Sequence, residues 1–313
     1  MTPTDLAVPD VRIGPHRDIG HFRDAAAFDR FLEVYRRGMA TLPTFEVRDV
    51  TTAFGTVRAY RFDGPAGPPV VLLPGRNAAT PMYRGNLPTL LRQRTVYGID
   101  LLGEAGLSVQ HTPIRSADDI AHWLDDALAG LGLPHAHLLG VSIGGWTAMN
   151  LAVRRPQRVA SLTLLDPVFT FAPVRTTPML ASIALIAPGV PPALRRRVLR
   201  WISGGADIDA AADEAALIAT ASRNFVLRQP IPRSFSDDQL RSVTRPVLAL
   251  IAGRSVMLDA QRATRRARSM LPHGEVELWP AASHAINGEY PERIAQRAAE
   301  FWTRVDSDSP HRG

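Results

Sequence analysis

The stretch from Ala136 to Arg154 reads AHLLGVSIGGWTAMNLAVR, and it decides the fold. A short apolar run leads into a Gly-x-Ser-x-Gly segment centred on Ser142, and a run with helical character follows without a break. A strand that turns this tightly into a helix requires glycine two residues before and two residues after the serine. The strained turn holds the hydroxyl clear of the sheet. The stretch therefore predicts a nucleophilic serine at Ser142.

Short apolar runs of the same kind recur on both sides of this unit, and helical segments separate most of them. These runs lack the polar alternation of a strand that has one face in water. Buried strands joined by helices indicate a mostly parallel, doubly wound sheet with right-handed crossovers. The runs are PVVLLPG, TVYGIDL, AHLLGVS, SLTLLDP, PVLALIAG and VELWPA.

The first 62 residues have a different pattern. Residues 22–40 place apolar side chains at helical spacing, which predicts an amphipathic leading helix. The runs FEVRDVTT and GTVRAYRF alternate and are separated by a short polar step. They predict two antiparallel strands at an edge of the sheet.

The interval from Pro167 to about Leu240 interrupts the alternation of strands and helices. It has no convincing strand, and proline and glycine separate its helical segments. We expect a helical lid at 167–240, inserted between two parts of one core at 1–166 and 241–313. The apolar face of this lid is expected to line the substrate pocket, and packing of that face as ordinary core is the alternative. The lid residues expected in the pocket are Met179, Leu180, Ile183 and Trp201.

Composition excludes several kinds of chemistry. The 313 residues include no Cys, and all 36 Lys+Arg residues are arginine. A thiol nucleophile, a thiolate zinc site, a disulfide and a lysine Schiff base are therefore excluded. We expect neither a metal nor a cofactor. The net charge of +6 does not by itself indicate a nucleic-acid partner, because the arginine clusters are mixed with apolar residues as on solvated helix faces.

The sequence also gives expectations about location. The N-terminal segment has early acidic residues and no apolar core of the signal-peptide type. The most apolar later stretch, MLASIALIAPGV, is about half of the roughly 20 residues that cross a bilayer. We therefore expect a cytoplasmic protein with no membrane partner. Its oligomeric state stays open, with a homodimer among the options.

A serine nucleophile needs a base, and the position of His284 suits that role. Of the nine histidines, His284 lies in a loop just after the last predicted strand, in VELWPAASHAINGEYPERI. An imidazole with an ordinary pKa of about 6.5 can accept the serine proton near neutrality and return it to the leaving group. The sequence therefore predicts that Ser142 and His284 act together.

Together these features resemble the α/β-hydrolase superfamily over roughly residues 45–305, in particular its lipase and carboxylesterase branch. LLPGRN follows the third strand, IDLLGEAGLS is similar to the family's Asp-x-x-Gly-x-Gly-x-Ser turn, GVSIGG to its elbow and SHAINGEYPE to its histidine loop. The resemblance implies an eight-stranded, mostly parallel sheet with the lid inserted after strand 6. It also implies cleavage of a small or medium-sized carboxylic ester through an acyl-enzyme on Ser142, with His284 as general base and then acid.

One departure from the family lies before the oxyanion loop, where Pro74-Gly75 stands in place of His-Gly. An oxyanion hole uses backbone N–H groups, so it can survive this change. We expect the backbone nitrogens of Ile143 and Arg76 to form it. The side chain of Arg76 either faces solvent or reaches an acidic substrate.

A second departure concerns the acid that orients the histidine. Relatives place it about three residues beyond the glycine that ends the seventh strand, but Ser255 and Val256 fill the expected positions after Gly253. Asp259, 259 − 253 = 6 residues past that glycine, resembles a helix N-cap. Asp166 ends the sixth strand, which in the family lies roughly 5 Å from the nucleophile strand, and some lipases carry their acid there in a similar Leu-Asp-Pro sequence. We expect Asp166 to orient His284, with Asp259 as the alternative.

The same arrangement of residues serves several reactions. Acyl transfer, thioester hydrolysis and C–C bond hydrolysis use it as well as ester hydrolysis. A non-catalytic ligand-binding protein on a hydrolase scaffold is the alternative outside enzymes. The altered acid position and the absent His-Gly motivate that alternative.

Overall fold

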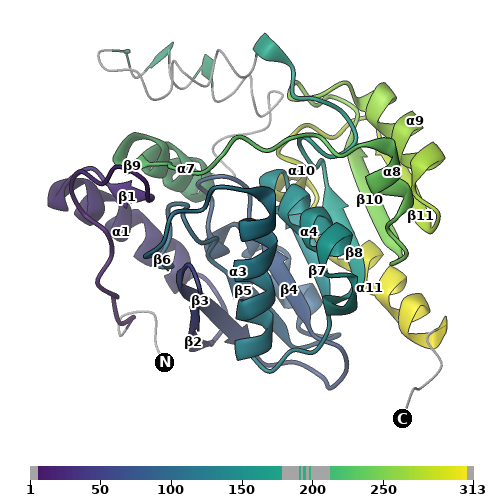
Figure 1. The fold of residues 1–313 in the computed structure, drawn as a ribbon, viewed down its shortest axis with the longest axis horizontal. Helices are drawn as coiled ribbons and strands as arrows, with labels where there is room; N and C mark the ends of the chain where they lie inside the picture. The colour runs from purple at the N-terminus through teal and green to yellow at the C-terminus, as the bar shows by residue number, and fades with distance from the viewer. Residues whose placement is uncertain (1–5, 178–189, 192, 195–196, 199–211, 309–313) are drawn as a thin grey trace.

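The computed structural model describes residues 6–177, 190–191, 193–194, 197–198 and 212–308, and a single large sheet lies at its centre (Figure 1). The strands of this sheet are β2 (Glu46–Thr52), β3 (Gly55–Phe62), β4 (Val70–Leu73), β5 (Val96–Ile99), β6 (Val109–Gln110), β7 (Ala136–Val141), β8 (Val159–Leu165), β10 (Val247–Ala252) and β11 (Gly274–Trp279). Eight of them form the order β11-β10-β8-β7-β4-β5-β3-β2, and β6 pairs with β3 as a ninth. The neighbours from β11 to β5 are parallel.

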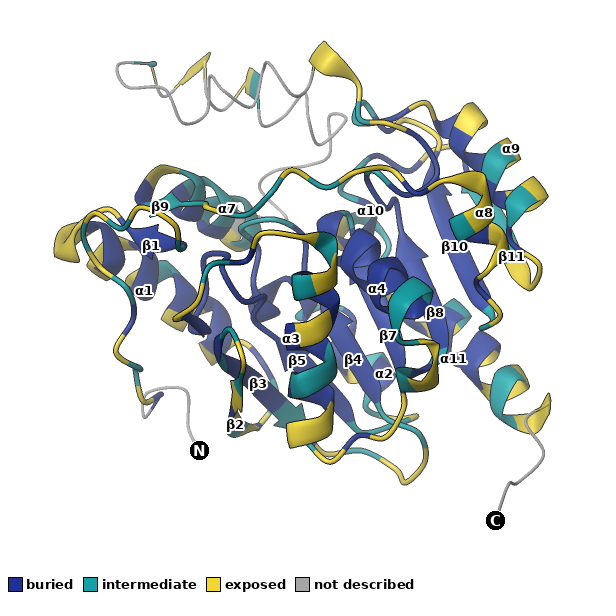
Figure 2. Cartoon of the chain, in the orientation of Figure 1, coloured by how far each residue is buried: buried dark blue, intermediate teal, exposed yellow. Residues whose placement is uncertain are grey.

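Helices cover both faces of the sheet. Adjacent residues of β4 show the two faces, because Val71 and Leu73 pack into one hydrophobic core while Val70 and Leu72 pack into the other. This is the double burial that the unbroken apolar runs predict, and Figure 2 shows the central strands buried throughout. One face carries α3 (Ala117–Gly130), α4 (Ile143–Arg154) and α9 (Ala260–Met270), and the other carries α1 (Ala25–Ala40), α2 (Leu87–Leu90) and α11 (Pro291–Asp308). The remaining helices are α7 (Ala212–Asn224), α8 (Asp237–Arg241), α10 (Ile286–Glu289) and the 3₁₀ helices η2 (Thr80–Tyr83) and η3 (Pro156–Arg158).

The strand predictions are confirmed. Each of the six apolar runs overlaps one strand of the parallel part of the sheet, although β8 and β11 begin two residues before their runs, and FEVRDVTT and GTVRAYRF contain β2 and β3. These two strands are antiparallel, and β2 lies at the edge of the sheet. The short strand β6 is an addition that no apolar run predicts.

The leading helix is shorter than predicted. Asp24 caps its N-terminus by accepting a hydrogen bond from the backbone N–H of Ala27, so α1 begins at Ala25 rather than at residue 22. The preceding residues, His21–Phe22, form strand β1 instead. An apolar residue just before a cap fits both a helix and a strand, and the spacing alone cannot separate them.

Part of the predicted lid interval is described. It holds α7 and, contrary to the prediction of an interval without strands, the strand β9 (Phe225–Val226), which pairs antiparallel with β1. A two-residue strand is too short to show alternation, so the sequence pattern could not reveal it. The lid boundaries stay a prediction. The four expected pocket residues, Met179, Leu180, Ile183 and Trp201, lie outside the described residues.

Candidate active site

The turn from β7 into α4 has the form that the sequence predicts. Ser142 occupies it with φ +53°, in the left-handed region that costs energy for any residue but glycine. A Cβ on Gly144 would lie 2.0 Å from the carbonyl oxygen of Leu73, and one on Gly140 would lie 2.4 Å from the oxygen of Gly144. Both glycines are therefore required by close backbone contacts, that of Gly144 with the end of β4 and that of Gly140 within the turn itself, and they fix Ser142 at the carboxyl end of β7.

A chain of hydrogen bonds links Ser142, His284 and Asp166. Nε2 of His284 lies 3.0 Å from Oγ of Ser142, and Nδ1 lies 2.6 Å from Oδ2 of Asp166. The carboxylate can only accept, so Nδ1–H is the donor, and Nε2 is left to accept the serine proton. Asp166 is fully buried, and the His284 side chain is 15% exposed. The structure thus brings together the three residues that the sequence singled out.

The two candidate acids differ in what they contact. Asp166 follows β8 and meets His284, whereas Asp259 is exposed and accepts the backbone N–H of Arg262 at 2.9 Å as the N-cap of α9. That hydrogen bond lowers the pKa of Asp259. The helix-capping interpretation of Asp259 is confirmed. Its carboxylate is occupied at the helix end, and it is Asp166 that contacts the imidazole.

Two backbone segments lie beside Ser142, and each carries one of the nitrogens predicted to form the oxyanion hole. Ile143 is the first residue of α4, so its N–H has no carbonyl of a preceding helical turn to bond. Gly75 lies beside the serine, since a Cβ on Gly75 would be 3.8 Å from the Cβ of Ser142. Arg76 follows Gly75 directly. The nitrogens of Ile143 and Arg76 therefore belong to two segments that meet at Ser142.

The side chain of Arg76 has a partner that neither sequence alternative included. Its Nη2 lies 3.5 Å from Oε1 of Glu104, a carboxylate that is 5% exposed. Glu104 comes from the IDLLGEAGLS turn after β5. The arginine charge at the rim of the site is therefore balanced from within the protein.

The loops that carry the site are held together by side chains that the sequence analysis did not single out. Asn287 donates from Nδ2 to the backbone oxygen of Met82 at 3.0 Å, which joins the histidine loop to η2. Glu289 accepts from the N–H and the hydroxyl of Ser283, at 2.8 and 2.7 Å, and so closes the loop around His284. Both residues lie in SHAINGEYPE, but their partners could not be read from the motif.

Hydrogen bonds of two side chains, Asp100 and Asn77, brace the segment after β4. Asp100 is fully buried and accepts from the N–H and hydroxyl of Thr80, at 3.1 and 2.9 Å, and from the hydroxyl of Tyr35 at 2.7 Å. Burial raises the pKa of Asp100, and these hydrogen bonds oppose the rise. Asn77 donates from Nδ2 to Oγ of Ser222 at 3.0 Å, which ties the segment to α7. The segment that carries Arg76 is thus fixed from two sides.

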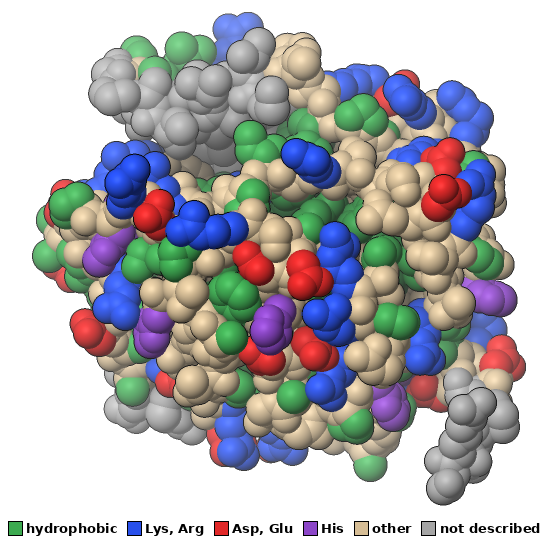
Figure 3. Space-filling model, viewed as in Figure 1, with side chains coloured by type: hydrophobic (Ala, Val, Ile, Leu, Met, Phe, Trp, Pro, Cys, Tyr) green, Lys and Arg blue, Asp and Glu red, His purple; other side chains and the backbone are tan. Residues whose placement is uncertain are grey.

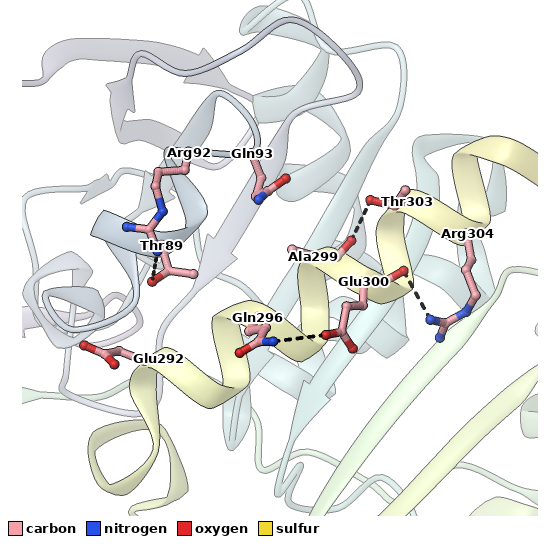
Figure 4. A pocket seen from close by; sticks show the side chains of 9 residues that line it. All are labelled: Thr89, Arg92, Gln93, Glu292, Gln296, Ala299, Glu300, Thr303 and Arg304. Carbon is pink, nitrogen blue, oxygen red and sulfur yellow. Dashed lines mark hydrogen bonds between the residues drawn. The ribbon is translucent and has the colours of Figure 1, made fainter.

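A hollow on the surface lies apart from these residues, between the end of α2 and α11 (Figure 4). Its polar side chains bond mostly along their own helices, as from Gln296 to Glu300 at 3.3 Å and from Arg92 to Thr89 at 3.0 Å. None of the predicted site residues lines it. Its lining consists of Thr89, Arg92, Gln93, Glu292, Gln296, Ala299, Glu300, Thr303 and Arg304. We interpret it as a junction of two solvated helix faces.

On the face shown in Figure 3, acidic side chains lie beside basic ones, including beside the column of basic side chains near the centre of the view. Several arginines pair with acids, such as Arg266 with Asp237 at 2.8 Å and Arg155 with Asp118 at 3.5 Å. Within the described ranges, no group of three His, Asp or Glu side chains is placed to hold a metal ion. Over the same ranges, no helix combines the length and apolar character needed to cross a bilayer.

Comparison with known proteins gives concordant matches. A model of the alpha/beta hydrolase fold family matches residues 68–285. An uncharacterized carboxylesterase of Bacillus subtilis is 27% identical over 281 residues, which cover 87% of this chain and 92% of the relative. Carboxylesterase YbfK of the same organism is 27% identical over 285 residues, or 87% of this chain and 93% of the relative. The crystal structure of naproxen esterase from B. subtilis matches with a TM-score of 0.82 and 26% identity, covering 89% of this chain and 99% of that one.

Proposed function

The chain belongs to the alpha/beta hydrolase fold family and hydrolyses ester bonds, and we propose that it does so through an acyl-enzyme on Ser142. The proposed substrate is a small or medium-sized carboxylic ester. The observation that carries this proposal is the hydrogen-bonded chain from Ser142 through His284 to Asp166, with 3.0 and 2.6 Å between the bonded atoms. Nucleophile, base and orienting acid are thereby in contact before any substrate binds.

In the first half-reaction, Oγ of Ser142 attacks the ester carbonyl while Nε2 of His284 takes the hydroxyl proton. The carbonyl π electrons move to the oxygen and give a tetrahedral oxyanion. Collapse of this intermediate expels the alcohol, which receives its proton from His284. In the second half-reaction, water attacks the acyl-enzyme with His284 again as base, and the acid product leaves as Ser142 regains its proton. Asp166 keeps Nδ1 protonated and stabilises the imidazolium throughout.

The oxyanion is proposed to be stabilised by the backbone N–H groups of Ile143 and Arg76. The N–H of Ile143 also lies at the N-terminus of α4, where the helix dipole favours negative charge. Such preorganised donors act most strongly on charge that develops in the transition state.

The pairing of Arg76 with Glu104 bears on the substrate class. The buried Glu104 carboxylate, 3.5 Å from the guanidinium, already offsets part of the positive charge that would attract a substrate carboxylate. We therefore propose that the ester is uncharged near the oxyanion loop. We also propose that the lid at 167–240 completes the substrate pocket with its apolar face.

The cytoplasmic location of the protein stays a prediction.

The test is covalent labelling together with a burst. A fluorophosphonate probe should label the wild-type protein at Ser142, and a p-nitrophenyl ester should release one equivalent of p-nitrophenol in a burst. Ser142→Ala should lose both signals. Ser269→Ala, which removes an exposed hydroxyl on α9 that donates to the backbone oxygen of Arg265 at 3.0 Å, is the control and should keep the label. An unlabelled wild-type protein without turnover would instead support a binding function.

A further inference from the structure

The carboxylate of Asp166 has more partners than His284. Its Oδ1 accepts the backbone N–H of Ala252 at 3.1 Å, and its Oδ2 accepts the hydroxyl of Ser255 at 2.6 Å in addition to Nδ1 of His284. Ser255 is 6% exposed and follows β10, near the position where the resemblance led us to expect the triad acid. The serine hydroxyl thus meets an acid supplied by the neighbouring strand, β8.

We propose that Ser255 is a positioning residue of the catalytic triad. Its hydroxyl holds the Asp166 carboxylate in the orientation that receives Nδ1–H of His284. This inference rests on the proposed function, because it assigns Ser255 a part in the same proton transfer.

The first support is the geometry of the carboxylate. A carboxylate can turn about its Cβ–Cγ bond, so a single anchor does not fix its plane. Here the N–H of Ala252 holds one oxygen and the hydroxyl of Ser255 holds the other. Because Asp166 is fully buried, its oxygens depend on protein donors rather than bulk water. Hydrogen bonds from neutral donors to an ionised acceptor are short and strong, as the 2.6 Å separation indicates.

The second support is the way the turn after β10 is held. The N–H of Ser255 donates to the oxygen of Ala252 at 3.1 Å, which shapes the turn. The N–H of Arg254 donates to the oxygen of Ala282 at 2.8 Å, two residues before His284. The same four-residue turn therefore contacts the acid through its side chain and the histidine loop through its backbone. This turn therefore holds Asp166 and the loop that carries His284 in fixed positions relative to each other.

A purely structural role is the competing explanation, and it makes different predictions. If the Ser255 hydroxyl only supplies a hydrogen bond that the buried Asp166 carboxylate needs, removing the hydroxyl should lower the thermal stability and leave kcat unchanged. A positioning role predicts a lower kcat at nearly constant KM, because the histidine is less well oriented when the transition state forms.

The experiment compares Ser255→Ala with Ser255→Cys, which keeps the shape but is a weaker donor. The matched control is Ser161→Ala, which removes a fully buried hydroxyl on β8 that lies 2.8 Å from Nδ1 of His137, outside the site. Each variant is assayed for p-nitrophenyl acetate turnover, for the rate of fluorophosphonate labelling and for Tm.

We expect Ser255→Ala to lower kcat by about 10- to 100-fold with KM within about twofold of wild type, as for a small misplacement of a catalytic group. Labelling should slow in parallel, Ser255→Cys should be intermediate, and Ser161→Ala should change Tm alone. Full kcat in both Ser255 variants, beside an inactive Ser142→Ala, would overturn this inference and leave the proposed function intact. An active Ser142→Ala would instead overturn the proposed function.

Discussion

Replacing Asp166 by Asn tests the acid assignment with almost no change in shape. The amide oxygen can still accept the N–H of Ala252, but the amide NH₂ then faces Nδ1 of His284, where the carboxylate oxygen lay at 2.6 Å. Two donors cannot share that contact, so the imidazole is expected to place its proton on Nε2 instead. Nε2 then donates toward Ser142 and can no longer accept the serine proton.

The size of the effect follows from this change of tautomer. Loss of the correct tautomer in a serine triad lowers kcat about 10⁴-fold, which corresponds to roughly 5 kcal/mol of transition-state stabilisation. The free energy of unfolding should change far less, because the amide fills the same buried space and keeps one of its hydrogen bonds. A catalytic loss much larger than any stability loss is therefore the expected signature.

The assay is initial-rate hydrolysis of p-nitrophenyl acetate, with thermal melting of the same samples. Asp259→Asn is the matched control, because Asn caps a helix about as well as Asp and the α9 cap should survive. We expect full activity from that control. An Asp166→Asn protein that retains more than about a tenth of wild-type kcat would refute the reasoning, as would an Asp259→Asn protein that loses activity.

Three further outcomes are expected. Ser142→Ala and His284→Ala should each abolish turnover in the ester assay. The double variant should lose no more activity than either single variant, because the two residues act as one proton-transfer unit. Losses that add in the double variant would contradict this. Gly144→Ala should fail to give folded protein by circular dichroism, since its Cβ would lie 2.0 Å from the oxygen of Leu73; a wild-type melt would count against the elbow geometry. Burial raises the pKa of Glu214 from 4.5 to about 7, so the folded state binds the proton more tightly than the unfolded chain. The free energy of unfolding should therefore fall as pH rises from about 4.5 to 7, by at most about 1.4 kcal/mol per pH unit, and Glu214→Gln should flatten that slope in melts from pH 5 to 8.

Much of the fold follows from local pattern. The unbroken apolar runs predict strands buried on both faces, and the glycines around Ser142 predict the elbow, because each depends on residues close together in the chain. His284 could be proposed from its place after the last predicted strand, and Asp166 from the strand order of the family that the chain resembles. These features need no knowledge of side-chain conformation.

The remaining features depend on contacts between distant segments. The hydroxyl of Ser255 on Asp166, the amide of Asn287 on Met82 and the pairing of Arg76 with Glu104 have no periodicity or spacing to reveal them. The strands β1 and β9 are two residues each, too short for a pattern to show. The sequence indicated that the usual acid position was altered, but it could not say what the serine there contacts.

The pairing of β1 with β9 sets a limit on how far the chain can be shortened. Phe22 of β1 packs against Phe225 of β9 with ring centroids 5.0 Å apart, and Arg23 donates its N–H to the oxygen of Asn224 at the end of α7. The same helix holds Asn77 beside the oxyanion loop through Ser222. A fragment trimmed to residues 68–285, the region that matches the family model, would keep Ser142, His284 and Asp166 yet lose the segment that supports α7. The smallest working form of this hydrolase must therefore extend upstream of the region that matches the family model, at least as far as β1.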